Sequence, residues 1–169
     1  MTQYILSNKE MAKADLLTIE SGISSLDLMF NAGKKVFNNL PVQRGKRALF
    51  ICGPGNNGGD GYVAADLLLK QGMEIDIYCP VSKAKESNDN LYYKQKLNNS
   101  LFVSKIKSIT NYCYVVDALF GTGLSRTMSN DLISLVNNVN QSKLDVFSVD
   151  IPSGINGDTS AVLGNAFKA

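Results

Sequence analysis

Gly53-Pro54-Gly55-Asn56-Asn57-Gly58-Gly59-Asp60-Gly61 is the stretch that decides the fold. The apolar run 48–52 precedes it and the amphipathic run 62–70 follows it, which predicts a strand, a glycine-rich turn and a helix. Glycine lets the backbone adopt a positive φ and lets a ligand come close to it. The unpaired N–H groups at the start of the helix favour anions. The stretch therefore predicts a phosphate-binding loop at the carboxyl end of a strand.

The loop contains the pattern G-x-G-x-x-G at Gly53, Gly55 and Gly58, a weak signal of dinucleotide binding when it stands alone. Dinucleotide-binding folds also place an acid at the end of the second strand, about twenty residues further on. The run 73–80 ends in Tyr-Cys-Pro instead, with Asp76 inside it. The loop also carries side-chain oxygens that a plain phosphate cradle does not need, at Asn56, Asn57 and Asp60. The alternative is a polar surface turn, which five glycines between a strand and a helix disfavour.

The composition narrows the function further. The chain has 169 residues, a formal net charge of +2 and no histidine. This charge gives no case for nucleic acid or an anionic membrane as a partner. No apolar run reaches the roughly 20 residues of a membrane span, and no signal peptide opens the chain, so we expect a cytoplasmic protein. Without histidine, Ser-His-Asp and Cys-His nucleophiles and most zinc sites are excluded, and proton transfer must use carboxylates, lysine, tyrosine or water.

Strands and helices are predicted to alternate along the chain, which favours an α/β fold with a mostly parallel sheet and helices on both faces. Two helices come first, one from a capping box at Ser7 to about Ile19 and one over about 23–37, and both are expected only to pack against the rest of the domain. The later helices are predicted near 62–70, 90–97 and 132–139, and the strands near 47–52, 73–79, 101–103, 112–117 and 144–150. The polar, lysine-rich stretch around 90–97 is interpreted as a solvated face.

Three loops follow strands that end at one edge of this sheet, where open α/β folds bind their ligands. They are the loop that begins at Gly53, the loop after Asp117 and the loop after Asp150. Both aspartates are predicted to be the last residues of their strands, and glycine follows each of them closely. An aspartate at one strand end is often a cap, but two such residues favour a binding or catalytic site.

Three blocks of the sequence, 53–61, 116–124 and 149–154, resemble the signatures of the NAD(P)H-hydrate epimerases, the YjeF amino-terminal domain family that includes the apolipoprotein A-I-binding proteins. The segment 20–33 is similar as well, so the resemblance covers nearly the whole chain. It implies a Rossmann-like three-layer αβα sandwich preceded by two N-terminal helices. It also implies epimerisation at C6 of the hydrated nicotinamide ring of NADHX and NADPHX, which repairs damaged cofactor.

The resemblance assigns roles to individual residues. It implies a potassium ion, one per subunit, held by Asn57, Asp117 and Ser153, whose oxygens suit a hard cation. It implies that the substrate contacts the first loop, the second loop and the third strand end, at Asn56, Asn57, Gly58, Gly59, Asp60, Gly121, Thr122, Gly123, Leu124, Ser125, Arg126, Thr127 and Asp150. Thr127 stands where the family has proline, and Ser160 where glycine is commoner.

The resemblance also bears on the extent of the chain and its partners. Family members continue past the segment that matches 166–169 into another strand, a lysine-bearing loop and more sheet. We therefore expect residues 1–169 to form a single domain that lacks the family's last strands and helix. The exposed flank of the last strand would then favour self-association, and a homodimer is one predicted assembly. The functional partner implied is an NAD(P)H-hydrate dehydratase, to which many relatives are fused.

The substrate carries a hydroxyl on a carbon beside the ring nitrogen. Protonation would let water leave and return to either face, and one carboxyl group can serve both directions. We assign this role to Asp150, since a bound cation would keep Asp117 ionised. Ring opening to an aldehyde is an alternative route. Two other functions stay open at this point, a nicotinamide-dependent oxidoreductase and an inactive relative that acts as a nucleotide-binding or scaffold protein.

Overall fold

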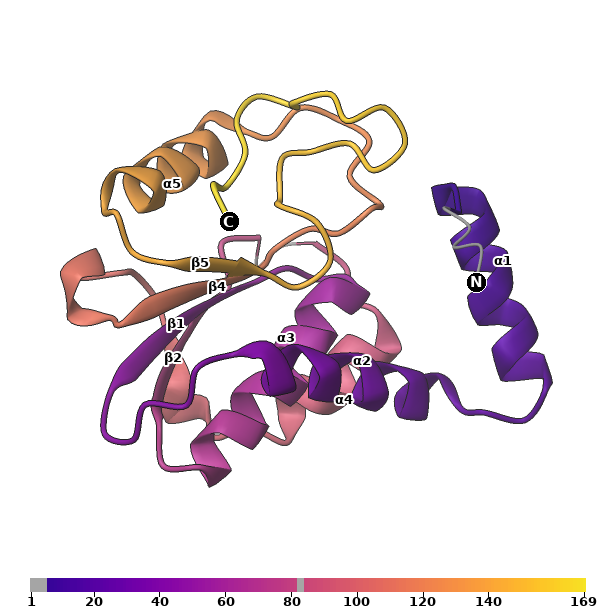
Figure 1. Ribbon diagram of the computed structural model, residues 1–169, viewed down its shortest axis with the longest axis horizontal. Helices are drawn as coiled ribbons and strands as arrows, with labels where there is room; N and C mark the ends of the chain where they lie inside the picture. The colour runs from indigo at the N-terminus through magenta and orange to yellow at the C-terminus, as the bar shows by residue number, and fades with distance from the viewer. Residues whose placement is uncertain (1–5, 82–83) are drawn as a thin grey trace.

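The computed structural model describes residues 6–81 and 84–169. Within these residues five strands form one parallel sheet in the order β3-β2-β1-β4-β5. The strands are β1 (Arg47–Cys52), β2 (Glu74–Tyr78), β3 (Phe102–Val103), β4 (Tyr114–Ala118) and β5 (Val146–Ser148). The helices are α1 (Asn8–Glu20), α2 (Ser25–Asn39), α3 (Asn56–Lys70), α4 (Asn88–Gln95) and α5 (Asn130–Gln141). Figure 1 shows α5 on one side of the sheet and α2, α3 and α4 on the other. The predicted α/β class and three-layer architecture are therefore confirmed.

Strand β1 is central because alternate residues of its apolar sequence fill both layers of the core. Phe50 packs in the core cluster that contains residues of α3, whereas Leu49 and Ile51 pack in the cluster that contains residues of α5. After β1 the chain runs outward to β2 and β3 and then returns to β4 on the other side. The sheet therefore has its switch point between β1 and β4, where loops diverge and a ligand can enter.

Several element boundaries differ from the predicted ones. Asp117 is the fourth residue of β4 rather than its end, and β5 stops at Ser148, two residues before Asp150. Asp150 thus lies in the loop after β5, where it is exposed. The strand predicted over about 144–150 is longer than β5, which pairs with β4 through three residue pairs and has no second partner strand among the described residues.

Helix α1 begins at the predicted capping box, where Ser7 accepts a hydrogen bond from the Glu10 N–H. The expectation that α1 packs on the body is wrong. None of its residues is buried, and Leu16 and Leu17 are each 54% exposed. Figure 1 shows the helix standing apart from the sheet. Its tie to the second glycine loop is a 2.9 Å bond from Asn8 Nδ2 to the Thr122 carbonyl.

The segment after Gly154 returns across the α5 side of the sheet. Phe167 is buried there, and its N–H donates to the Ser153 carbonyl at 3.2 Å. Asn140 on α5 donates to the Ala166 carbonyl and accepts from the Lys168 N–H. Through Phe167 the segment therefore contributes to the core on this side of the sheet. Among the described residues, no helix is both long enough and apolar enough to cross a membrane.

Candidate active site

The first glycine-rich loop is shorter than its sequence suggests, because α3 already begins at Asn56. Gly58 and Gly59 are buried inside its first turn. A Cβ on Gly58 would collide with the Gly53 carbonyl, and one on Gly59 would collide with the sulfur of Met29. In the described residues, positive φ angles occur at other glycines and not in this loop. Close approach, rather than backbone conformation, therefore explains these glycines.

The second glycine loop packs against Asp150. The Thr122 N–H donates to Asp150 Oδ2 at 3.0 Å, and a Cβ on Gly121 would lie 2.5 Å from the same oxygen. A Cβ on Gly53 would meet the Leu119 carbonyl, so the first and second loops also touch. The three strand ends named by the sequence thus meet at one edge of the sheet.

These loops enclose a cleft of about 1300 Å³. Most of the predicted substrate residues line it, namely Asn56, Asn57, Asp60, Gly121, Thr122, Gly123, Leu124, Ser125, Arg126 and Asp150. Gly58 and Gly59 are packed behind this wall, and Thr127 is exposed outside it. Residues that the sequence did not suggest complete the wall, among them Asp15 from α1 and Lys35 from α2. Only the tertiary structure brings these helices to the cleft, so no local motif marks them.

Asp117 is fully buried beneath the cleft and is surrounded by donors. Its Oδ1 accepts from Ser153 Oγ at 2.6 Å and from the Leu119 N–H at 3.2 Å. Its Oδ2 accepts from the Ser153 N–H at 2.7 Å and from Ser148 Oγ at 2.9 Å. Burial raises the pKa of Asp117 to about 6, although these hydrogen bonds act in the opposite direction. The arrangement favours a carboxylate that is held in one orientation.

Asn57 carries the clearest sign of a missing partner. Its Oδ1 and Nδ2 are both buried and make no hydrogen bond within the described residues. A buried polar atom without a partner is costly, and a bound ion is one way to satisfy it. The described residues contain no group of three or more His, Cys, Asp or Glu side chains that could hold a metal. Asn57, Asp117 and Ser153 offer one amide oxygen, one carboxylate and one hydroxyl, which fit a hard, weakly charged cation.

Asp60 is the carboxyl group whose protonation the cleft changes most. Burial, together with the negative charges of Asp150 and Asp15, raises its pKa to about 7. A carboxyl group with this pKa is both a competent acid and a competent base near neutral pH. The sequence marked Asp60 only as a substrate contact, because burial and the position of α1 are not visible in the motif.

Comparison with known proteins gives a consistent result. The family described as YjeF-related protein N-terminus matches residues 25–169. An NAD(P)H-hydrate epimerase of Lentilactobacillus buchneri is 35% identical over 175 residues, which cover 100% of this chain and 81% of the relative. An NAD(P)H-hydrate epimerase of Oenococcus oeni is also 35% identical, over 100% of this chain and 83% of the relative.

A bifunctional NAD(P)H-hydrate repair enzyme Nnr of Synechocystis is 30% identical, over 98% of this chain and 32% of that enzyme. Among solved structures, the crystal structure of yeast ynu0, YNL200c, matches with a TM-score of 0.78 at 25% identity, covering 98% of this chain and 77% of that one. With a family match over most of its length and two such relatives along its whole length, this chain belongs to the family of YjeF-related protein N-termini.

Proposed function

We propose that this chain acts as an NAD(P)H-hydrate epimerase, an isomerase that interconverts the R and S forms of NADHX and NADPHX at C6 of the nicotinamide ring. The name carried by relatives that match the full chain supports this function. The observation that carries it is the cleft, in which two carboxyl groups, Asp60 and Asp150, face a space bounded by both glycine loops. The reaction needs proton transfer next to a phosphate-bearing ligand. The cleft has carboxyl groups that can transfer a proton and glycine loops that can bind phosphate.

In the proposed mechanism, a protonated carboxyl group donates to the hydroxyl on C6. Water then leaves, and the lone pair of the ring nitrogen stabilises the resulting cation. Water adds back to either face and returns its proton to the carboxylate, so atoms and charge balance over the cycle. Asp150 is the proposed proton carrier, oriented by the Thr122 N–H. Asp60, with a pKa of about 7, is placed to share the proton.

We further propose that a potassium ion binds to Asn57, Asp117 and Ser153. The unpartnered Asn57 Oδ1 and the fixed Asp117 carboxylate support this assignment. When bound, the ion supplies positive charge beside the anionic substrate. The protein's own contribution is the orientation of Asp117, which Ser153 holds through both its N–H and its Oγ.

The other functions considered are less well supported. A nicotinamide-dependent oxidoreductase would hold the ribose with an acid at the end of β2, where the chain has Tyr78-Cys79-Pro80. An inactive scaffold would not need the carboxyl pair in the cleft. We propose a dehydratase that consumes the S form as the functional partner, in line with the bifunctional relatives. The homodimer and the cytoplasmic location stay predictions.

The decisive experiment mixes the protein with both NADHX epimers and an S-specific dehydratase. The dehydratase alone consumes the S form, after which the slow spontaneous epimerisation of the R form limits the rate. We expect added protein to accelerate the loss of the R form in proportion to its concentration. An R-form decay that is unchanged at any protein concentration would refute the proposed function, and NADH oxidation with added substrates would favour the oxidoreductase.

A further inference from the structure

Helix α4 contacts the first glycine loop through four hydrogen bonds from two residues at its start. The Ser87 N–H donates to the Pro54 carbonyl at 3.0 Å, and Ser87 Oγ donates to Asn56 Oδ1 at 2.8 Å. Asn90 Nδ2 donates to the carbonyls of Gly53 at 3.1 Å and Gly55 at 2.8 Å. The sequence had suggested only a solvated helix here. The structure instead places α4 directly behind the loop.

Asn90 is an unusual residue for a short polar helix. It is 0% exposed, and among the described residues the other buried polar side chains are Asp117 and Ser153, both at the candidate ion site. Its Oδ1 has no donor within the described residues. Burying an amide costs free energy unless its hydrogen bonds compensate for the lost water. For Asn90 this compensation comes from the two bonds that Nδ2 donates to the loop.

These bonds fix the orientation of two consecutive peptide groups. The Pro54 carbonyl accepts from the Ser87 N–H, and the Gly55 carbonyl accepts from Asn90 Nδ2 as well as from the Gly58 and Gly59 N–H groups in the first turn of α3. In a planar trans peptide the N–H points opposite to the carbonyl, so the N–H groups of Gly55 and Asn56 point away from α4. Both residues line the cleft, and neither N–H donates a hydrogen bond within the described residues. Two such N–H groups at a helix N-terminus favour a phosphate.

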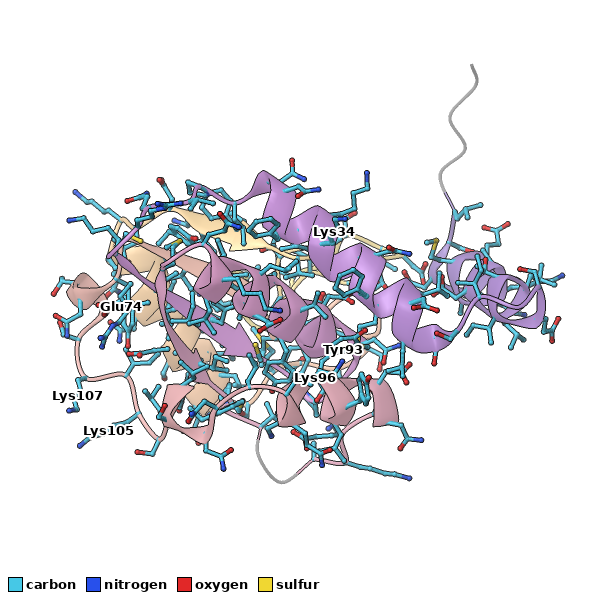
Figure 2. All side chains as sticks on the ribbon, turned by 90° about the horizontal axis from the view of Figure 1, so that it is seen from below. Lys34, Glu74, Tyr93, Lys96, Lys105 and Lys107 are labelled. Carbon is cyan, nitrogen blue, oxygen red and sulfur yellow. The ribbon has the colours of Figure 1, made fainter. Side chains whose placement is uncertain are left out.

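Helix α4 has its own anchor, which lets it serve as a fixed support. The Tyr93 hydroxyl donates to the Leu26 carbonyl of α2 at 2.8 Å. Lys96 lies over the rings of Tyr92 and Tyr93, 4.1 and 5.0 Å from their centroids. Figure 2 labels Tyr93 on α4 and, near it, Lys96, the residue that follows the helix. The support for the loop thus comes from packing that the loop itself does not provide.

We propose that Asn90 is a positioning residue for substrate binding, which supports the Gly53–Gly55 turn and so the Asn56 N–H that faces the phosphate groups of a dinucleotide. This inference rests on the proposed function for the identity of the substrate. Without Asn90 the Gly53 carbonyl loses its donor among the described residues, and the Gly55 carbonyl keeps only the Gly58 and Gly59 N–H groups, so the turn that presents the Asn56 N–H is held less firmly. A positioning role of this kind predicts a loss of affinity for the phosphate-bearing ligand, with a smaller change in the chemical step.

The test compares Asn90→Leu with Leu91→Ala, a control on the exposed side of the same helix. NADP⁺ serves as an unreactive probe, and its dissociation constant is measured by calorimetry. We expect Asn90→Leu to weaken NADP⁺ binding by about tenfold or more and to raise KM for NADHX by a similar factor, with kcat changed by less than about threefold. Leu91→Ala should leave both constants unchanged. The amide signal of Asn56 should shift with NADP⁺ in the wild type and much less in Asn90→Leu.

If Asn90→Leu does not fold, Ser87→Ala removes the hydroxyl that donates to Asn56 Oδ1 and accepts from the Asn90 N–H, and it should weaken NADP⁺ binding in the same direction. A lower melting temperature with unchanged NADP⁺ affinity and unchanged KM would mean that Asn90 is only structural, and would overturn the inference. A wild-type protein that binds NADP⁺ through Asn90 but does not epimerise NADHX would refute the proposed function and leave the inference standing.

Discussion

The Thr122 N–H and the Asp150 carboxylate are joined by a 3.0 Å hydrogen bond across 28 positions of the sequence. The bond couples the second glycine loop to the proposed proton carrier, and Gly121 permits it because a Cβ there would lie 2.5 Å from Asp150 Oδ2. The loop therefore has a second role beside its proposed contact with substrate. It sets the direction in which the Asp150 carboxyl group faces the cleft.

Gly121→Ala should separate this orienting role from general loop flexibility. The added methyl group displaces the Asp150 carboxylate, so we expect kcat for NADHX epimerisation to fall by about tenfold or more, as misplaced catalytic groups commonly cause. At Gly123 a Cβ would meet none of the described residues within 4 Å. Gly123→Ala should therefore have the smaller effect of the two. Steady-state kinetics on both variants makes the comparison, and equal losses would contradict the coupling.

Asp150→Asn should abolish epimerisation while the fold stays intact, since an amide has the shape of the carboxyl group but does not carry its proton. Activity is measured in the coupled dehydratase assay and folding by circular dichroism. The matched control is Asp145→Asn, an exposed carboxylate at the other end of β5. Retention of most of the wild-type rate by Asp150→Asn would assign the proton transfer to another group, with Asp60 the first to be tested.

Asp60 should make the stability of the protein depend on pH. Its pKa rises from an ordinary 3.8 to about 7 in the fold, so the folded state holds a proton that the unfolded state has released. The resulting penalty is absent below pH 3.8, grows as pH rises and is complete above pH 7. At about 1.4 kcal/mol for each pKa unit it amounts to on the order of 4 kcal/mol.

Asp60→Asn removes this penalty and should stabilise the protein at pH 8 much more than at pH 4. Urea unfolding of wild type and variant at the two pH values measures the difference. Asp15→Asn should act in the same direction and more weakly, because Asp15 contributes least to the raised pKa of Asp60. A variant that is equally or less stable than wild type at pH 8 would show that the Asp60 carboxyl group is not destabilised by the cleft.

The proposed ion site predicts a selective effect of potassium on stability. An ion that binds only the folded state raises the melting temperature with its concentration. We expect KCl to stabilise the wild type more than LiCl at equal ionic strength, and Asn57→Ala to abolish the difference. A crystal soaked in rubidium should show density between Asn57, Asp117 and Ser153, at distances longer than the roughly 2.3–2.6 Å of calcium. Equal effects of the two salts would argue against the site.

The sequence was sufficient to predict the parallel sheet, because the apolar runs of its buried strands and the glycine loops that follow them are local signals. It also placed Asp117 and Asp150 toward the same edge of the sheet, since parallel strands end at one edge. It missed Asn90, because a single asparagine in a polar helix carries no mark of burial. It misjudged α1, whose apolar residues follow a helical pattern but stay exposed in the part of the chain that the structure describes. Both errors concern contacts between elements, which a motif does not encode.

Phe167 should stabilise the proposed ion site without contacting it. Its ring is 3% exposed among the residues under α5, and its N–H bonds the carbonyl of Ser153, the residue that orients Asp117. Phe167→Ala should cost about 3–5 kcal/mol of unfolding free energy and loosen the segment that carries Ser153, so the variant should also lose its selective response to potassium. Val162→Ala, at a side chain 57% exposed, is the control and should change neither property. Urea unfolding and limited proteolysis between residues 157 and 165 measure the outcome. If Phe167→Ala loses stability but responds to potassium like the wild type, then the packing of Phe167 next to Ser153 is not needed to keep the proposed ion site in place.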